Sequence, residues 1–165
     1  MNNLENVGAI DTRRKRRDTH GMAAIGFKIT RNDLSPALSR LASTAKNPTP
    51  VFRAMGTTFL FLTMGTFNSV GASYRPRPWP SKKDGSPSNL ILHGVLSKSF
   101  HLDVTSTYAK VSNPMIYAAA HQFGYPKRNL PARPFYPVLE DKLTPAAEEK
   151  IAAAGQRAIL REAGQ

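Results

Sequence analysis

The chain contains no cysteine among its 165 residues, and this absence excludes two kinds of protein. Without thiols there is no disulfide framework and no thiolate metal site, so the chain suits a reducing cytoplasm. Acidic residues are also scarce, because 11 Asp and Glu stand against 23 Lys and Arg and leave a net charge of +12. Such a surplus predicts attraction to nucleic acid or to acidic protein surfaces.

Long hydrophobic runs are missing as well. The longest uncharged apolar stretch, residues 54–67, contains four threonines and two glycines. It is shorter than the run of about 20 mostly apolar residues that crosses a bilayer. The basic segment near the N-terminus is not followed by the apolar region of a secretory signal. We therefore expect no association with a membrane.

Signatures of catalysis are absent too. The four histidines are His20, His93, His101 and His121. No two of them have metal-ligand spacing with a third ligand nearby. Phosphate-binding, dinucleotide-binding, zinc-protease and serine-hydrolase motifs do not occur. The paired carboxylates at residues 140–141 and 148–149 are adjacent and would point apart on a helix. We expect no enzymatic activity, no metal and no cofactor.

A cluster of basic residues marks an N-terminal extension, which we place at residues 1–22. The cluster consists of Arg13, Arg14, Lys15, Arg16 and Arg17. It is interpreted either as a contact to DNA or an acidic protein surface, or as a solvated tail, because basic runs are common in tails. Patterned sequence follows, so we assign a folded domain to residues 23–140 and a C-terminal helix to residues 141–165.

Apolar periodicity in the central part predicts an α+β fold, with a small antiparallel sheet packed by several helices. Ile25, Phe27 and Ile29 alternate with small or polar residues, which is the pattern of a strand with one buried face. A hairpin is predicted within residues 101–112. Its turn is expected near residues 105–107, although no Asn-Gly pair marks it.

Helices are predicted where apolar residues recur every three or four positions. The predicted helices cover residues 36–46, 49–70, 89–99 and 115–123. A last helix is predicted to begin at residue 145. The helix at 49–70 has an apolar face so broad that we expect burial on more than one side. The last helix has only a shallow face of small residues, so we expect it on the rim of the fold or waiting for a partner. Thr144 is its predicted cap.

A long irregular loop is predicted at residues 71–89, because four prolines there prevent regular structure. The loop carries the only tryptophan, Trp79, with the basic residues Arg75, Arg77, Lys82 and Lys83. It could dock on a neighbouring subunit, where tryptophan and arginine often dominate binding. It could also stack on bases and follow phosphates. We favour the subunit contact and assign the two lysines to DNA or an acidic surface.

The most distinctive stretch begins at Tyr117 with Tyr-Ala-Ala-Ala-His-Gln-Phe-Gly and ends with Pro-Ala-Arg-Pro-Phe at residues 131–135. Gly124 is expected to end the helix in a left-handed conformation. Flanking prolines stiffen Arg133, so we predict that it makes an ion pair or a carbonyl contact at a fold or ring interface. His121 is interpreted as a hydrogen-bonded anchor of the helix end, with a pH-sensitive interface group as the alternative.

This combination resembles the virion morphogenesis, or tail-completion, family of Mu-like and related tailed bacteriophages. In that family a YAxxHQxG helix end is followed by a PARPF segment. The matching residues are Tyr117, Ala118, His121, Gln122, Gly124, Pro131, Ala132, Arg133, Pro134 and Phe135. The likeness extends from about Ile25 to Val138 through the order of elements. The N-terminal basic run and the loop around Trp79 lie outside the family pattern.

The resemblance implies a structural virion protein, assembled in the host cytoplasm, that completes the tail at the head–tail junction. It also implies a six-fold ring around the DNA channel, with neighbouring neck and tail proteins as partners and non-specific contact with DNA. The residues assigned to the subunit interface are Arg75, Arg77, Trp79, Tyr117, His121, Arg133 and Phe135. The alternative is a free nucleic-acid-binding protein that uses the basic tail and the loop, although no known DNA- or RNA-binding signature supports it.

Overall fold

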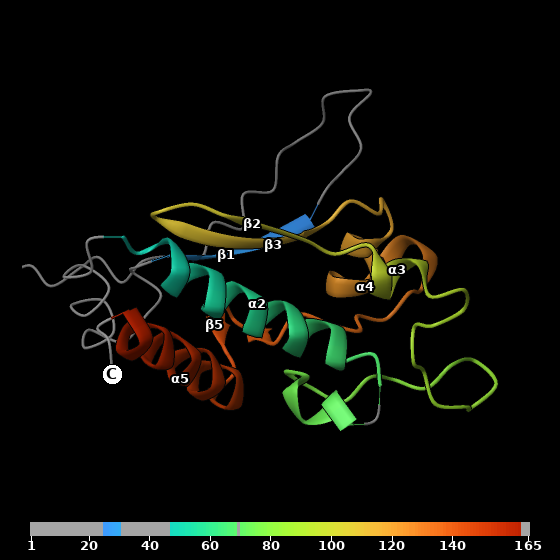
Figure 1. Ribbon diagram of the computed structural model, residues 1–165. Helices are drawn as coiled ribbons and strands as arrows, with labels where there is room; N and C mark the ends of the chain where they lie inside the picture. The colour runs from blue at the N-terminus through green and yellow to red at the C-terminus, as the bar shows by residue number, and fades with distance from the viewer. Residues whose placement is uncertain (1–24, 31–46, 69, 163–165) are drawn as a thin grey trace, which may run out of the picture.

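The computed structural model describes residues 25–30, 47–68 and 70–162 of this chain. In that part, a three-stranded antiparallel sheet is crossed on one face by the long helix α2, and a second long helix, α5, lies against α2 (Figure 1). Small helices and an irregular loop gather at the opposite end from the C-terminus of α5. The α+β fold class predicted from the sequence is confirmed.

The predicted strand and hairpin form the sheet. Its strands are β1 (Ile25–Thr30), β2 (His101–Val104) and β3 (Tyr108–Asn113), in the order β1-β3-β2. Phe27 pairs with Val111 across β1 and β3, and both side chains are buried. At the hairpin turn the Thr105 hydroxyl accepts hydrogen bonds from the backbone N–H groups of Thr107 and Tyr108. A threonine therefore stabilises the turn where an Asn-Gly pair is missing.

Helix α2 (Thr49–Gly65) is buried on two sides, as its broad apolar face predicted, because it packs against both the sheet and α5. It approaches the sheet most closely at Gly56. A Cβ atom there would come within 2.6 Å of the Ala109 Cβ, so only glycine permits this approach. Two large apolar residues of α2 stay outside, since Phe61 is 74% and Met64 42% exposed. The helix ends five residues before the predicted end, and the short 3₁₀ helix η2 (Val70–Tyr74) comes next among the described elements.

Helix α5 (Pro145–Glu162) does not sit on the rim as predicted. It packs along α2 and buries Ala147, Ile151 and Ala154. Small side chains made its apolar face look shallow in sequence, but they also let two helices approach closely. The Thr144 hydroxyl is buried without a hydrogen-bond partner among the described residues, so the predicted side-chain cap is not made. The helix begins instead with the Glu148 N–H donating to the Thr144 carbonyl.

Three further elements differ from the predictions. Helix α3 covers only Val95–Lys98, and α4 covers Ala118–Phe123, three residues shorter at its start than expected. A two-stranded hairpin of β4 (Val138–Leu139) and β5 (Lys142–Leu143) was not predicted. The predicted helix at residues 36–46 and the N-terminal extension lie outside the described residues.

The core is rich in aromatic rings that close around the PARPF segment. Tyr136 contacts Phe27 at a ring-centroid distance of 4.2 Å, and Phe135 contacts Phe67 at 5.5 Å. Phe135 and Tyr136 are both 0% exposed. Burial raises the pKa of the Tyr136 hydroxyl, which donates a hydrogen bond of 3.4 Å to the Val111 carbonyl. The segment after α4 therefore belongs to the core of the domain.

Candidate functional site

The two halves of the family motif bind each other. The Gln122 Oε1 atom accepts hydrogen bonds from the backbone N–H groups of Phe135 at 3.0 Å and Tyr136 at 3.2 Å. At the residue before Gln122, the His121 carbonyl accepts a bond of 2.7 Å from the Arg133 N–H. We call these contacts between α4 and residues 133–136 the motif clamp. Because Gln122 is only 5% exposed, its amide satisfies backbone donors that water does not reach.

Gly124 ends α4, but in a conformation that differs from the prediction. Its φ of 80° is positive as expected, whereas its ψ of 167° is extended and not left-handed helical. A Cβ atom at this position would lie 3.0 Å from the Ala132 N atom and 3.1 Å from the Leu130 carbonyl oxygen. Glycine is therefore needed here both for its backbone conformation and for the close approach of the following segment.

Arg133 makes carbonyl contacts within its own chain. Its Nε donates to the Pro80 carbonyl at 3.0 Å, and its Nη2 donates to the Ser81 carbonyl at 2.9 Å. The residue is 7% exposed. Of the contacts predicted for this arginine, the structure has the carbonyl contact at a fold interface, which ties the motif clamp to the proline-rich loop.

The proline-rich loop is docked on the chain that carries it. The Trp79 Nε1 donates to the Pro134 carbonyl at 2.8 Å, and the Arg75 guanidinium lies 3.9 Å from the centre of the Trp79 ring. Arg75 Nε also donates to the Thr66 carbonyl at 2.7 Å, and partial burial lowers its pKa. Trp79 and Arg75 are both half-buried by these contacts.

The residues predicted at a subunit interface therefore fall into three groups. Phe135 has no exposed surface, so its assignment to an interface is wrong: the side chain belongs to the core. Arg75, Trp79 and Arg133 are engaged with their own chain. Arg77 and Tyr117 are exposed and His121 is half-buried, and their part in an interface stays a prediction.

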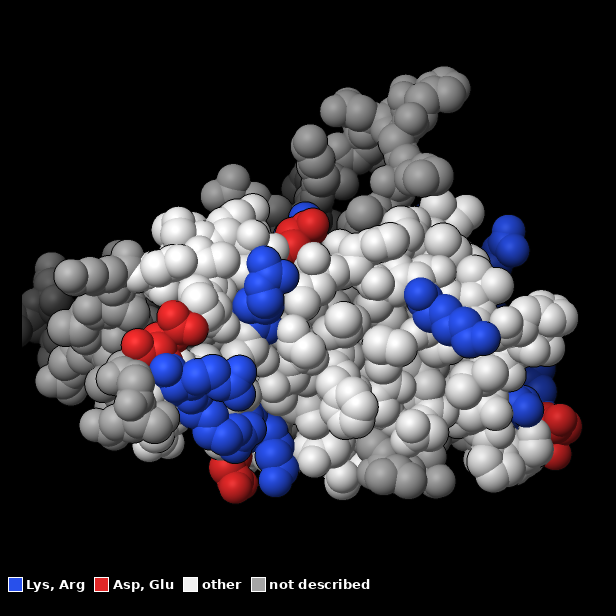
Figure 2. All heavy atoms as spheres, viewed as in Figure 1, with Lys and Arg blue, Asp and Glu red and all other residues white. Residues whose placement is uncertain are grey.

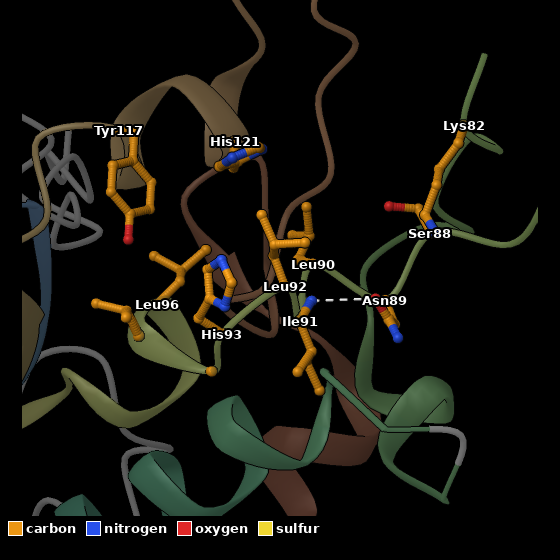
Figure 3. A pocket seen from close by; sticks show the side chains of 12 residues that line it. Lys82, Ser88, Asn89, Leu90, Ile91, Leu92, His93, Leu96, Tyr117 and His121 are labelled. Atoms are coloured by element: carbon orange, nitrogen blue, oxygen red, sulfur yellow. Dashed lines mark hydrogen bonds between the residues drawn. The ribbon is translucent and has the colours of Figure 1, made fainter. Parts of the chain in front are cut away.

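A pocket of about 390 Å³ lies between α3, α4 and the proline-rich loop (Figure 3). We call it the α3–α4 pocket. Tyr117 and His121 project into it from α4, and His93 and Leu96 project from the opposite wall. Its outer apolar residues are well exposed, at 87% for Leu92. The motif clamp and Arg133 hold both the α4 wall and the loop that carries Lys82, another lining residue.

The α3–α4 pocket combines apolar walls with cationic or titratable groups. Lys82, His93 and His121 line it, and no Asp or Glu is among its lining residues. The Nδ1 atom of His121 is buried without a hydrogen-bond partner in the described part of the chain. His121 does anchor the helix end by a hydrogen bond, but through its backbone carbonyl and not through its imidazole. Burial, and then the nearby Arg133, lower the pKa of the His121 imidazole.

A second charged feature lies at the other end of the molecule. Figure 2 shows Lys and Arg side chains gathered where α5 lies, whereas the middle of this face carries few charges. Arg53 of α2 and Arg161 of α5 line a hollow of about 330 Å³ near the start of α2. Sequence reasoning missed this pair because only the packing of α5 on α2 brings the two residues together. Of the residues predicted to contact DNA, Lys82 and Lys83 are exposed in the loop, and Arg13–Arg17 lie outside the described residues.

The described residues contain neither a candidate metal site nor a membrane-spanning helix. No group of three His, Asp or Glu side chains there is arranged to hold a metal ion. None of the helices in that part of the chain has the length and apolar character needed to span a bilayer.

The profile of the phage virion morphogenesis family matches residues 29–159. The chain belongs to this family. The match covers both halves of the motif clamp and most of α5, so the resemblance seen in the sequence is confirmed. Membership of this structural family indicates a structural role in a phage virion.

Similarity to individual proteins is more limited. An uncharacterized protein of Methanocaldococcus jannaschii is 40% identical over 77 residues, which are 42% of this chain and 57% of that protein. The chain thus spans little more than half the length of this relative. No solved structure matches the chain.

Proposed function

We propose that this member of the phage virion morphogenesis family acts at the head–tail junction, where it completes the tail and joins it to the head. The observation that carries the proposal is that residues of the family motif shape a pocket at the surface. Gln122, Gly124 and Arg133 fix the walls of an exposed, largely apolar pocket. A motif that builds an interaction surface suits a protein that works by assembly.

The ring around the DNA channel is part of the same proposal. A ring of identical subunits needs two different surfaces per chain that fit each other. The α3–α4 pocket supplies apolar surface for one of these contacts. The net charge of +12 per chain supports a position near DNA, where contacts would be made to phosphates without sequence preference.

Electron microscopy of a lysate from a phage or prophage that lacks this gene tests the proposal. We expect filled heads and separate tails side by side, and we expect joined particles again when the wild-type gene is supplied in trans. Intact, joined particles in the deletion lysate would overturn the proposed role in tail completion. The same lysates with variant genes in trans give a functional readout for the residues named above.

A second candidate function, binding of free nucleic acid, is favoured by the arginine pair Arg53 and Arg161. Binding to duplex DNA would fall steeply with salt, because each neutralised phosphate contributes a slope of about −0.9 in log K against log salt. The double variant Arg53→Gln, Arg161→Gln should then lower that slope by about two. Strong binding of this kind, together with joined particles in the deletion lysate, would decide for the second function.

A further inference from the structure

The turn between β4 and β5 has the chemical character that the α3–α4 pocket lacks. Leu139, at the start of the turn, is 49% exposed, and both Glu140 and Asp141 are exposed. Neither carboxylate forms an ion pair within the described part of the chain. This short hairpin therefore presents one apolar side chain next to two free negative charges, which we call the acidic turn (residues 139–141).

The backbone of the acidic turn is strained. Glu140 has a φ of 48° and Asp141 a φ of 64°, so both central residues are left-handed, as in a type I′ turn. Such turns favour Asn-Gly, and residues other than glycine, asparagine and aspartate are strained in this region. Strained backbone conformations of this kind concentrate at binding sites, where function requires particular side chains in spite of the strain. Glutamate at the first central position is therefore not a residue that the turn itself favours.

The α3–α4 pocket is complementary in both respects. Leu90, Ile91 and Leu92 provide apolar lining, while the exposed Lys82 and His93 provide cationic or titratable groups. The nearest carboxylate along the loop, Asp84, does not line the pocket. It accepts hydrogen bonds from the Ser86 hydroxyl at 2.6 Å and the Ser86 N–H at 2.9 Å, which lower its pKa and hold it in its own turn.

The acidic turn and the pocket lie apart on the chain. Figure 1 shows β5 beside α5, whereas α3 and α4 stand at the other end of the molecule. The two surfaces therefore cannot meet within one copy in this arrangement, but they can meet between copies. Contacts between different patches on identical chains are heterologous, and they form a ring when the rotation closes.

We propose that the acidic turn of one copy inserts Leu139 into the α3–α4 pocket of the next copy. Glu140 and Asp141 then lie beside Lys82 and His93, and the apolar side chain covers Leu92. The occupant of the pocket is thus a second copy of this chain. The closing of these contacts into a ring rests on the proposed function, whereas the pairwise contact is tested on the purified protein.

Cross-linking provides the first test, because the full chain contains no cysteine of its own. The variant Leu139→Cys, Leu92→Cys should give a ladder of dimers and higher oligomers with a short bis-maleimide reagent. Each single variant should give no ladder. The matched control, Leu139→Cys, Phe61→Cys, moves the second thiol to another exposed apolar position, which is 74% exposed, and should stay monomeric. A control ladder as strong as that of the first variant would overturn the proposal.

Sedimentation provides the second test and separates a structural role of the turn from a binding role. In the variant Glu140→Asn, Asp141→Gly the turn gains the two residues that type I′ geometry favours and loses both charges. We expect its melting temperature to equal or exceed that of the wild type while self-association weakens at least tenfold. Leu92→Glu, which changes an exposed residue, should also prevent association, whereas Phe61→Glu should not.

Mixing the two defective chains makes the head-to-tail geometry visible. The turn variant keeps a sound pocket and Leu92→Glu keeps a sound turn, so the mixture should form dimers and nothing larger. A wild-type chain that stays monomeric at all concentrations would overturn the proposal, as would undiminished association of the turn variant. Neither result would decide the role in tail completion, which the deletion lysate tests independently. A turn variant that restores joined particles fully would also contradict the contact between copies.

Discussion

Replacing Gln122 by leucine should destabilise the protein strongly, because one side-chain amide serves two buried backbone groups. Its Oε1 accepts from the N–H groups of Phe135 and Tyr136, and both of these residues are 0% exposed. Leucine fills a similar volume but accepts no hydrogen bond. Each orphaned buried donor costs about 1–3 kcal/mol, so the free energy of unfolding should fall by roughly 2–6 kcal/mol. That is a large part of the 5–15 kcal/mol typical of a folded domain.

Thermal and urea unfolding of the purified chain measure this loss. For a protein of this size, 1 kcal/mol lowers the melting temperature by about 2–4 °C, so a decrease of roughly 4–24 °C is expected. The matched control is Gln156→Leu, the same chemical change at an exposed position of α5. Surface substitutions of this kind usually change stability by less than about 0.5 kcal/mol. Hydrogen exchange should also show that the Phe135 and Tyr136 amides lose protection in the Gln122 variant.

A small effect at Gln122 would refute the reasoning. If both glutamine variants unfold within about 0.5 kcal/mol of the wild type, then the two N–H groups find other partners and the motif clamp is not what holds the PARPF segment. A large effect in both variants would instead point to a general intolerance of leucine in the helices. Only a large loss at position 122 together with a small one at position 156 supports the clamp.

Three further outcomes are expected. Gly124→Ala should destabilise by more than Gly85→Ala in urea unfolding, because both glycines have positive φ but only the first is crowded by backbone within 3.1 Å; equal losses would mean that conformation alone matters. Arg133→Met should lower the free energy of unfolding by about 1.5–3 kcal/mol, because two hydrogen bonds from the guanidinium to loop carbonyls are lost and water replaces them at exposed residues. The proline-rich loop should then be cleaved faster in limited proteolysis. An unchanged cleavage rate would show that Arg133 does not hold the loop. Burial and the nearby Arg133 lower the pKa of His121 from 6.5. As the pH falls below 6.5, His121 is therefore protonated in the unfolded chain before it is protonated in the folded chain. Stability present above that pH is then lost, and His121→Gln should lose less of it than the wild type between about pH 7 and pH 5 in paired melting curves; parallel curves would contradict this assignment.

The strands and α2 were open to prediction because their signals are local. Phe27 and Ile29 alternate with small or polar residues, and both side chains are buried in the sheet as that pattern requires. The hairpin needed only two apolar runs and a short polar turn between them. In α2 the apolar arc was too wide for one contact, which predicted the two-sided burial that the sheet and α5 provide. Each of these predictions depends on residues only a few positions apart.

The β4–β5 hairpin and the true place of α5 were not open to prediction in this way. Glu140-Asp141 is not the Asn-Gly or Asp-Gly pair that marks a type I′ turn, so the sequence carries no strong turn signal here. The alanine-rich face of α5 is shallow by composition, and only the presence of α2 shows that small side chains serve close packing. Similarly, the Gln122 amide reads as an ordinary polar residue until two N–H groups, 13 and 14 positions away, are seen to need it.

The sequence alone determined the α+β class, the family and the absence of a recognisable catalytic motif, since these follow from composition, short-range periodicity and one compact motif. The tertiary structure decided what that motif does. The α3–α4 pocket takes Lys82 from the loop, His93 and Leu96 from around α3, and His121 from α4. Groups so far apart in the sequence meet only when the chain folds. Hydrogen bonds and packing between distant segments bring them together, and no local sequence pattern indicates these contacts. The complementarity of pocket and acidic turn is likewise a property of the folded surface.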